Sequence, residues 1–249
     1  MRLVGATACV LAGCASAGMP DQMGTPDSNT QQTDAPMMTM KDSSMTMTDA
    51  PVGPMTRTLS QTTTMTIKAG NTIACGNTTG TRANNYYRVF DLPAMGITGA
   101  FSVTQVSFQI EHCHANAGTG CTLAVRVGTY SAAPGATLAQ ANMTILASNA
   151  SVAVPEVVEN TTTVPPTTPG GTVNAPITAT IPAGSKLLVE VDAPDGANLY
   201  SFYMGSNDGG ETGFGYVLAP TCSINVPTNI STVGTAGPRH LLLTVTGQY

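Results

Sequence analysis

The sequence predicts an all-β fold, a single antiparallel β-sandwich preceded by a disordered N-terminal tether. From Leu59 onward, apolar and polar residues alternate in short runs, and this period of two is typical of half-buried strands. Clusters of Pro, Gly, Asn and Asp separate the runs, as they do in sandwiches. Helical periodicity is absent from every long run. We therefore expect strands joined by turns.

The alternation places each strand and its core face. The strand over residues 101–112 puts Thr104, Val106, Phe108 and Ile110 on one face, which we expect to face the core, and Val103 on the other. The expected strands cover residues 64–74, 86–92, 101–112, 122–130, 143–154, 177–181, 186–193, 199–206 and 240–249.

Two segments lack this alternation. Residues 14–58 are rich in Thr, Ser, Asp, Pro and Met and contain few aliphatic side chains. Such a segment cannot bury enough surface to offset its ordering entropy, so it predicts a disordered linker with an r.m.s. span of roughly 35 Å. The sandwich domain then covers residues 59–249. A loop over residues 160–171 contains two adjacent prolines and is expected to project from one end of the domain.

Composition limits the partners. Only 9% of the residues are charged, and the formal net charge is −5. A nucleic-acid partner requires a basic patch that neutralises phosphates, whereas the nine Lys and Arg residues here are scattered. We therefore expect no nucleic-acid partner.

The first residues predict export. Residues 1–13 place Arg2 before an apolar run that is too short to span a bilayer, which takes about 20 apolar residues. The following Leu11-Ala12-Gly13-Cys14 resembles the lipobox of bacterial lipoproteins. The resemblance implies a lipoprotein signal peptide, cleavage before Cys14, and a lipid on Cys14 that anchors the protein to the outer membrane or cell surface. The alternative is an ordinary signal peptide with an incidental cysteine.

Four cysteines remain in the exported domain: Cys75, Cys113, Cys121 and Cys222. An even number in an oxidising compartment predicts two disulfides. Cys113 and Cys121 flank a Gly-rich loop between two expected strands, so we pair them locally. This leaves Cys75 to pair with Cys222.

Residues 84–111, 178–196, 202–234 and 240–247 resemble a β-sandwich module of secreted bacterial proteins. Such modules are often appended to proteases or other surface enzymes. The resemblance implies a jelly-roll-like sandwich with an accessory, adhesive or binding role and without an activity of its own. Cys75 and Cys222 fall where the cysteines of that family lie.

Two groups of residues are weak metal candidates. His112 and His114 alternate on an expected strand and share one side, which would allow a shared zinc ion. Oxygen ligands for structural calcium come from two loops, although the same residues are ordinary turn formers. The calcium candidates are Asp192, Asp195, Asn207, Asp208 and Glu211. We expect no cofactor, with structural calcium as the alternative.

Catalytic motifs are missing. The sequence lacks G-x-S-x-G, H-E-x-x-H and a P-loop, and its acidic residues are isolated along the chain. We therefore predict a non-catalytic, lipid-anchored binding or structural module of the cell envelope with a glycan or surface-protein ligand. A carbohydrate-binding accessory module is the first alternative, with aromatic side chains stacking on sugars. A hydrolase whose carboxylates converge only in the fold is the second.

Overall fold

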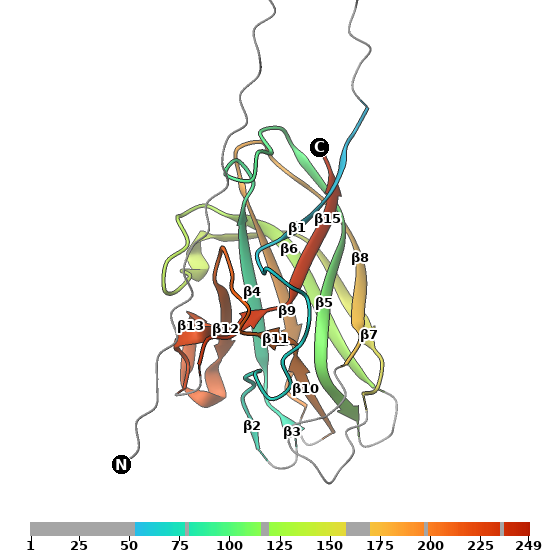
Figure 1. Cartoon of the computed structure of the whole chain (residues 1–249), viewed down its shortest axis with the longest axis vertical. Coiled ribbons are helices and arrows are strands. Elements are labelled where there is room, and N and C mark those ends of the chain that lie inside the picture. The colour runs from blue at the N-terminus through green and yellow to red at the C-terminus, as the bar shows by residue number, and fades with distance from the viewer. Residues whose placement is uncertain (1–52, 78–79, 116–119, 158–169, 197–198, 235–236) are drawn as a thin grey trace, which may run out of the picture. The chain divides into compact units, whose positions relative to one another are not determined.

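The chain folds into antiparallel sheets (Figure 1). In this computed structural model the described residues are 53–77, 80–115, 120–157, 170–196, 199–234 and 237–249. The β5 sheet contains β1 (Thr56–Ser60), β15 (Leu243–Gln248), β5 (Phe101–Ala115), β10 (Tyr200–Met204) and β8 (Thr172–Ile181). The β4 sheet runs in the order β13 (Ile224–Asn229), β12 (Gly215–Ala219), β4 (Asn84–Asp91), β9 (Lys186–Ala193), β6 (Cys121–Tyr130) and β7 (Met143–Val154). The all-β prediction is confirmed.

Short elements complete the described part of the chain. Two ribbons pair β2 (Gly76–Asn77) with β3 (Gly80–Thr81) and β11 (Ser206–Asn207) with β14 (His240–Leu241). The 3₁₀ turns are η1 (Gln140–Asn142), η2 (Pro220–Cys222) and η3 (Ile230–Thr232). No helix among the described residues has the length and apolar character needed to cross a bilayer.

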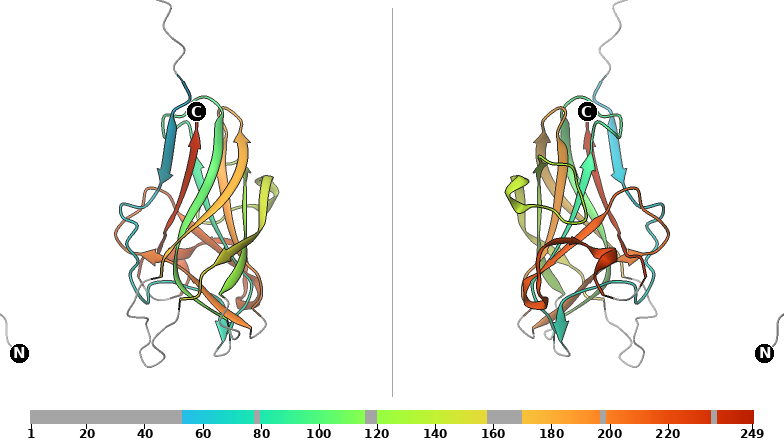
Figure 2. Two further views of the ribbon diagram at one scale, coloured as in Figure 1. Left: turned by 90° about the vertical axis from the view of Figure 1, so that its right-hand side faces the viewer. Right: turned by 90° about the vertical axis from the view of Figure 1, so that its left-hand side faces the viewer.

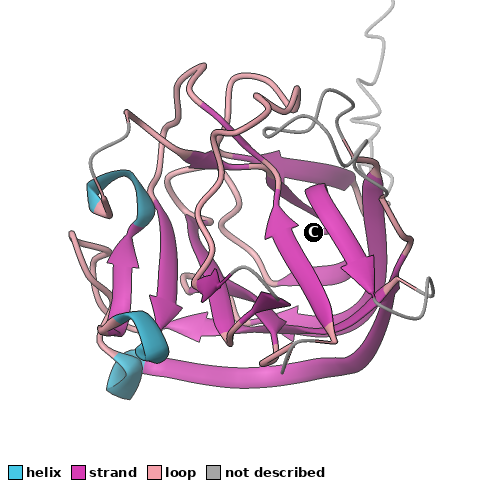
Figure 3. Ribbon diagram, turned by 90° about the horizontal axis from the view of Figure 1, so that it is seen from below, coloured by secondary structure: helices cyan, strands magenta, loops and turns pink. Residues whose placement is uncertain are grey.

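The inner faces of the β5 and β4 sheets pack on one hydrophobic core. Val106, Phe108 and Ile110 of β5 and Tyr86 and Phe90 of β4 all lie in it with no exposed surface. Burying one large apolar side chain stabilises the fold by about 1.5–3 kcal/mol, so this alternating set accounts for the sandwich. Figure 3, an end-on view, shows the strands arranged around this interior.

The outer face of the β4 sheet carries a second, smaller cluster. Tyr87 and Val89 of β4 lie there because successive side chains of a strand point to opposite faces. Leu138, in the loop after β6, packs on them, and its backbone N–H donates to Pro227 O at 2.9 Å. Both faces of β4 are therefore buried along most of its length.

Three strand predictions need correction. A β-bulge between Val103 and Gln105 turns Val103 into the core and leaves Thr104 exposed, which reverses the expected faces at that point. The strand expected over residues 64–74 does not form, because Gly70 has a positive φ and its turn interrupts the run. Strand β1 was not expected, and it runs from Thr56 to Ser60 and pairs with β15.

Strands β12 and β13 were missed. Gly215–Ala219 is a short apolar run without alternation, and Pro227 interrupts the pattern of β13. Proline lacks the N–H that a central strand needs, and β13 accordingly lies at the edge of the β4 sheet. The predicted loop over residues 160–171 lies almost wholly outside the described residues, as do the signal, Cys14 and most of the linker.

Strand β5 runs from one end of the domain to the other. At one end, the backbones of Met55 and Tyr249 exchange hydrogen bonds of 3.0 and 3.1 Å, and Gln248 pairs with Ser102. At the other end, Ala115 pairs with Tyr200. The 15 residues of β5 extend over roughly 45 Å at about 3.3 Å per residue. Both views in Figure 2 show the first strand and the C-terminus at the same end.

Both predicted disulfides are present. Cys75 bonds to Cys222 across 147 residues, and Cys113 bonds to Cys121 across 8. The first bridge joins the segment before β4 to the turn after β12. The second joins the end of β5 to the start of β6.

Candidate functional site

An open cleft of about 720 Å³ lies at the end of the domain where β5 finishes. Its volume is within the usual range of ligand pockets, about 300–1,000 Å³. Its lining is mainly apolar, with one arginine and one aspartate. The residues of this outer cleft are Ala115, Gly120, Thr122, Leu123, Ala124, Arg126, Ala150, Asp192, Pro194, Leu199 and Tyr200.

The charged side chains of the outer cleft are held by strand register. Arg126 of β6 and Tyr87 of β4 lie directly opposite Glu190 of β9, one on each side. Arg126 Nη1 is 3.0 Å from Glu190 Oε1, and Arg126 Nη2 donates to Asp192 Oδ2 at 2.7 Å. Because one guanidinium binds two carboxylates, these three side chains have a fixed arrangement at the base of the cleft.

Two further donors bind the buried Glu190. Asn85 Nδ2 and Tyr87 OH donate to Glu190 Oε1 at 2.7 and 3.1 Å. Burial raises the pKa of Tyr87, and the negative charge of Glu190 raises it further. Tyr87 therefore remains a neutral donor at physiological pH. Three donors thus contact Glu190 Oε1, and the Glu190 side chain is 8% exposed, whereas Asp192 and Arg126 keep 21% and 32% of their side-chain surface exposed.

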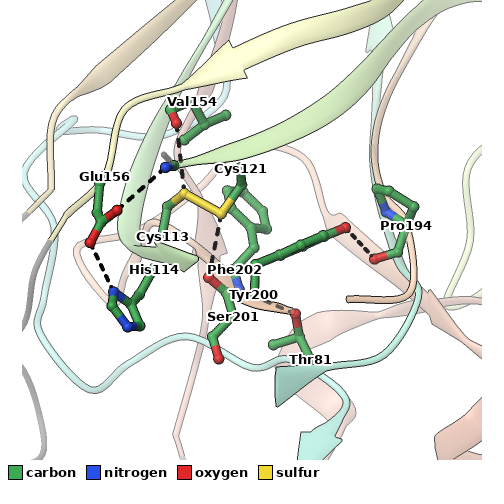
Figure 4. The surroundings of a disulfide bond; sticks show 11 residues. Thr81, Cys113, His114, Cys121, Val154, Glu156, Pro194, Tyr200, Ser201 and Phe202 are labelled. Carbon is green, nitrogen blue, oxygen red and sulfur yellow. Dashed lines mark hydrogen bonds and ion pairs between the residues drawn. A yellow bond between two sulfur atoms is a disulfide. The ribbon is translucent and has the colours of Figure 1, made fainter. Parts of the chain in front are cut away.

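One wall of the outer cleft comes from the chain that enters β10. The Leu199 residue is 65% exposed there. Tyr200 OH donates to Pro194 O at 2.6 Å, which fixes the ring (Figure 4). Burial raises the pKa of Tyr200 to about 12, with the charges of Asp192 and Asp195 adding to the effect. The wall therefore combines an exposed aliphatic side chain with a fixed phenol.

The local disulfide holds the rim. Cys121 Sγ lies 3.5 Å from Ser201 O, and the backbone of Cys113 pairs with Val157. Glu156 accepts from Gly120 N at 3.4 Å and lies 3.0 Å from His114 Nδ1. Figure 4 shows these groups around the sulfur pair, beside Tyr200. The bridge thus ties β5 to β6 at the edge of the cleft.

The two candidate zinc ligands do not converge with a third. The rings of His112 and His114 are 6.3 Å apart, and His112 packs on Tyr203 at 5.1 Å. His114 is bound to Glu156 instead. Within the part of the chain that the structure describes, no three His, Cys, Asp or Glu side chains gather in a metal-ligating group.

The calcium candidates separate into different contacts. Asp192 binds Arg126 in the outer cleft, Asp195 lies 3.5 Å from Arg82, and Asp208 pairs with Lys68. The other two are Asn207, whose amide donates to two backbone carbonyls, and Glu211, which binds Arg88. The predicted calcium group is therefore not assembled among the described residues, because each of the five side chains binds a different partner elsewhere in the fold.

A buried charge cluster lies elsewhere on β4. Arg88 has no exposed surface, and its Nη2 is 3.0 Å from Glu211 Oε2. The remaining donors of Arg88 bind Leu241 O, Gly213 O and Gln61 Oε1 at 2.6 to 3.1 Å. Burial lowers the pKa of Arg88 and raises that of Glu211. We call these residues the Arg88 cluster.

Sequence reasoning identified Asp192 as a candidate site residue but missed Arg126, Glu190 and Tyr87. A usable signal was present, because Glu190 and Asp192 interrupt an otherwise apolar strand at alternate positions. Two acidic residues two apart on a buried strand share one face. A positive partner on a neighbouring strand was therefore to be expected.

No protein-family model matches the chain, and no curated protein matches it. One similar solved structure is that of the cysteine protease and lectin-like domains of Cwp84, a surface-layer-associated protein of Clostridium difficile. It is 14% identical, with a TM-score of 0.40 over 68% of this chain. The match spans 32% of that chain, so this protein corresponds to about a third of its length. Similarity at this level does not transfer an activity.

Proposed function

We propose that the domain is a non-catalytic binding module of the cell envelope, anchored through Cys14, and that the outer cleft receives its ligand. The observation that carries the proposal is the position of this cleft. The cleft lies at the end of β5 that contains Ala115. Met55, near the start of the described chain, lies at the opposite end, roughly 45 Å away along the strand. The candidate ligand site and the start of the described chain therefore lie at opposite ends of β5.

The lining favours a segment of another envelope protein as the ligand. Leu199, Pro194 and Ala150 offer apolar contact, while Arg126 and Asp192 keep part of their surface exposed at the base. An apolar centre with a few oriented charges, arginine among them, is typical of protein interfaces. The exposed Leu199 supplies a side chain for a partner to cover.

The engagement of the carboxylates supports a non-catalytic role over a hydrolase. A glycoside hydrolase needs one carboxylic acid and one carboxylate facing the substrate. Beneath the outer cleft, Glu190 Oε1 is contacted by three donors, and in its lining Asp192 is bound by Arg126. Arg126 therefore occupies both carboxylates with charge-assisted contacts. This arrangement suits recognition better than proton transfer.

Photo-crosslinking in the intact envelope tests this function. We expect a photoreactive amino acid at Leu199, which is 65% exposed, to yield a covalent adduct with an envelope protein that mass spectrometry identifies. The substitution Asp192→Arg should abolish the adduct, since it breaks the Arg126 pair and reverses the charge at the base of the cleft.

Val226 provides the matched control, because it is an exposed apolar residue, 48% accessible, on the edge strand β13 of the β4 sheet. A photoreactive group there should not capture the same partner. Identical adducts from both positions, or none from Leu199, would contradict a ligand site in the outer cleft. A glycan adduct from Leu199 would instead support the carbohydrate alternative.

The anchor has its own test. The intact mass of the membrane-extracted protein is expected to correspond to a chain that begins at Cys14 and carries acyl groups. Alkylation without reductant should add no mass, because the remaining cysteines of the mature chain are in two disulfides. A mature chain that begins elsewhere without lipid would overturn the anchor and leave the outer cleft proposal to stand by itself.

A further inference from the structure

A second, smaller pocket lies beside the Arg88 cluster, apart from the outer cleft. It has a volume of about 310 Å³, at the small end of the range for ligand sites. Its lining combines aromatic, carboxylate and amide groups. We call it the Phe214 pocket, and the residues that matter are Gln61, Asp91, Pro134, Glu211, Phe214 and Tyr216.

The apolar walls of the Phe214 pocket are held in place. Phe214 is 47% exposed, and its ring meets that of Tyr216 edge-on, with centroids 6.4 Å apart and planes at 83°. Tyr216 OH donates to Gly135 O at 2.8 Å, which fixes the loop that carries Pro134. An exposed aromatic face supported from beneath is a platform on which an apolar ligand surface can stack.

The polar groups of the pocket are ordered by the Arg88 cluster. Arg88 binds both Glu211 Oε2 and Gln61 Oε1, at 3.0 and 3.1 Å, while Gln61 Nε2 donates to Val89 O at 2.8 Å. Gly213 permits this packing, because a Cβ there would lie 2.2 Å from Gln61 Nε2. The side chains of Glu211 and Gln61 are therefore held in fixed orientations, with His240 Nε2 4.0 Å from Glu211 Oε1.

Charge compensation decides the ligand class. Glu211 is neutralised by Arg88, and Asp91 lies 3.9 Å from Lys186 Nζ. A cationic ligand would gain little from carboxylates that are already paired. Hydroxyl groups, in contrast, donate well to the free lone pairs of ion-paired carboxylates. The pocket thus joins a platform for an apolar face to acceptors for hydroxyls at its edge.

We propose that the Phe214 pocket binds a neutral saccharide, with one pyranose ring stacked on Phe214 and its hydroxyls donating to Glu211 and Asp91. A pyranose has the required shape, since its C–H face is apolar and its rim carries hydroxyls. This site is separate from the outer cleft and does not depend on the proposed protein ligand.

Saturation-transfer NMR on the detergent-solubilised mature protein tests the proposal, with the neutral methyl pyranosides of glucose, galactose, mannose and N-acetylglucosamine as probes. At least one should bind, with its C–H protons receiving the strongest transfer. Phe214→Ala should weaken that binding about tenfold, which corresponds to about 1.4 kcal/mol for one lost stacking contact. Phe214→Tyr should retain it.

The matched control is Leu199→Ala, which removes an exposed apolar side chain from the outer cleft and should leave saccharide binding unchanged. Thermal melts of all variants should coincide, because the Phe214 side chain is half exposed. The proposal is overturned if no pyranoside binds, if Phe214→Ala binds as well as the native protein, or if Leu199→Ala abolishes binding. The first two outcomes would leave the crosslinking expected at Leu199 unchanged, whereas the third would place the saccharide in the outer cleft.

Discussion

Replacing Arg88 by methionine is expected to lower the free energy of unfolding by about 3–5 kcal/mol. Arg88 has no exposed surface, and its guanidinium binds Glu211 and the backbone carbonyls of Leu241 and Gly213. Methionine fills a similar volume but supplies no donor. The loss arises because the Glu211 charge and these carbonyls remain buried without their partner. Urea unfolding followed by circular dichroism measures the change.

Two variants separate this cause from a general sensitivity to losing an arginine. Arg82→Met removes a guanidinium from an exposed pair with Asp195, at 3.5 Å, and should cost less than about 1 kcal/mol. The double variant Arg88→Met, Glu211→Met should be more stable than Arg88→Met alone, since it removes the orphaned carboxylate. If Arg88→Met unfolds with the same midpoint as Arg82→Met, the buried pair does not stabilise the domain as we argue.

The core of the sandwich was predictable because alternation is a local property. The spacing of Val106, Phe108 and Ile110 alone predicts a core face, and each of these residues is fully buried. Exceptions arise where geometry departs from a regular strand. The bulge that buries Val103, and the Gly70 turn that interrupts residues 64–74, depend on pairing with distant segments. Periodicity contains no information about such pairing.

The candidate sites were predictable only in part, for the same reason. The sequence identifies Asp192 and Glu211 as oxygen donors, but their partners Arg126 and Arg88 lie 66 and 123 residues away. From sequence alone, an arginine between apolar residues of a strand is predicted to face solvent. Arg88 is instead buried by Gln61 and Gly213, which come from loops with no periodic signal. The fold therefore places these acids beside arginines that are distant in the sequence.

Removing the disulfide between Cys75 and Cys222 is expected to lower the free energy of unfolding by about 5 kcal/mol, against about 2.5 kcal/mol for the bridge between Cys113 and Cys121. The difference follows from loop length, because the bridges close 147 and 8 residues. A longer closed loop removes more conformational entropy from the unfolded chain. Alanine pairs at each bridge, compared by urea unfolding, measure both losses.

For ligand binding we expect the opposite order, with the larger effect from removing the bridge between Cys113 and Cys121. Cys113 and Cys121 hold the rim of the outer cleft beside Tyr200, whereas Cys75 and Cys222 lie away from its lining. We therefore expect the Cys113→Ala, Cys121→Ala variant to lose the crosslink from Leu199 while staying folded. The Cys75→Ala, Cys222→Ala variant should keep this crosslink at temperatures where it is folded. Equal crosslinking in both variants would show that the local bridge serves stability alone, and would remove it from the binding site.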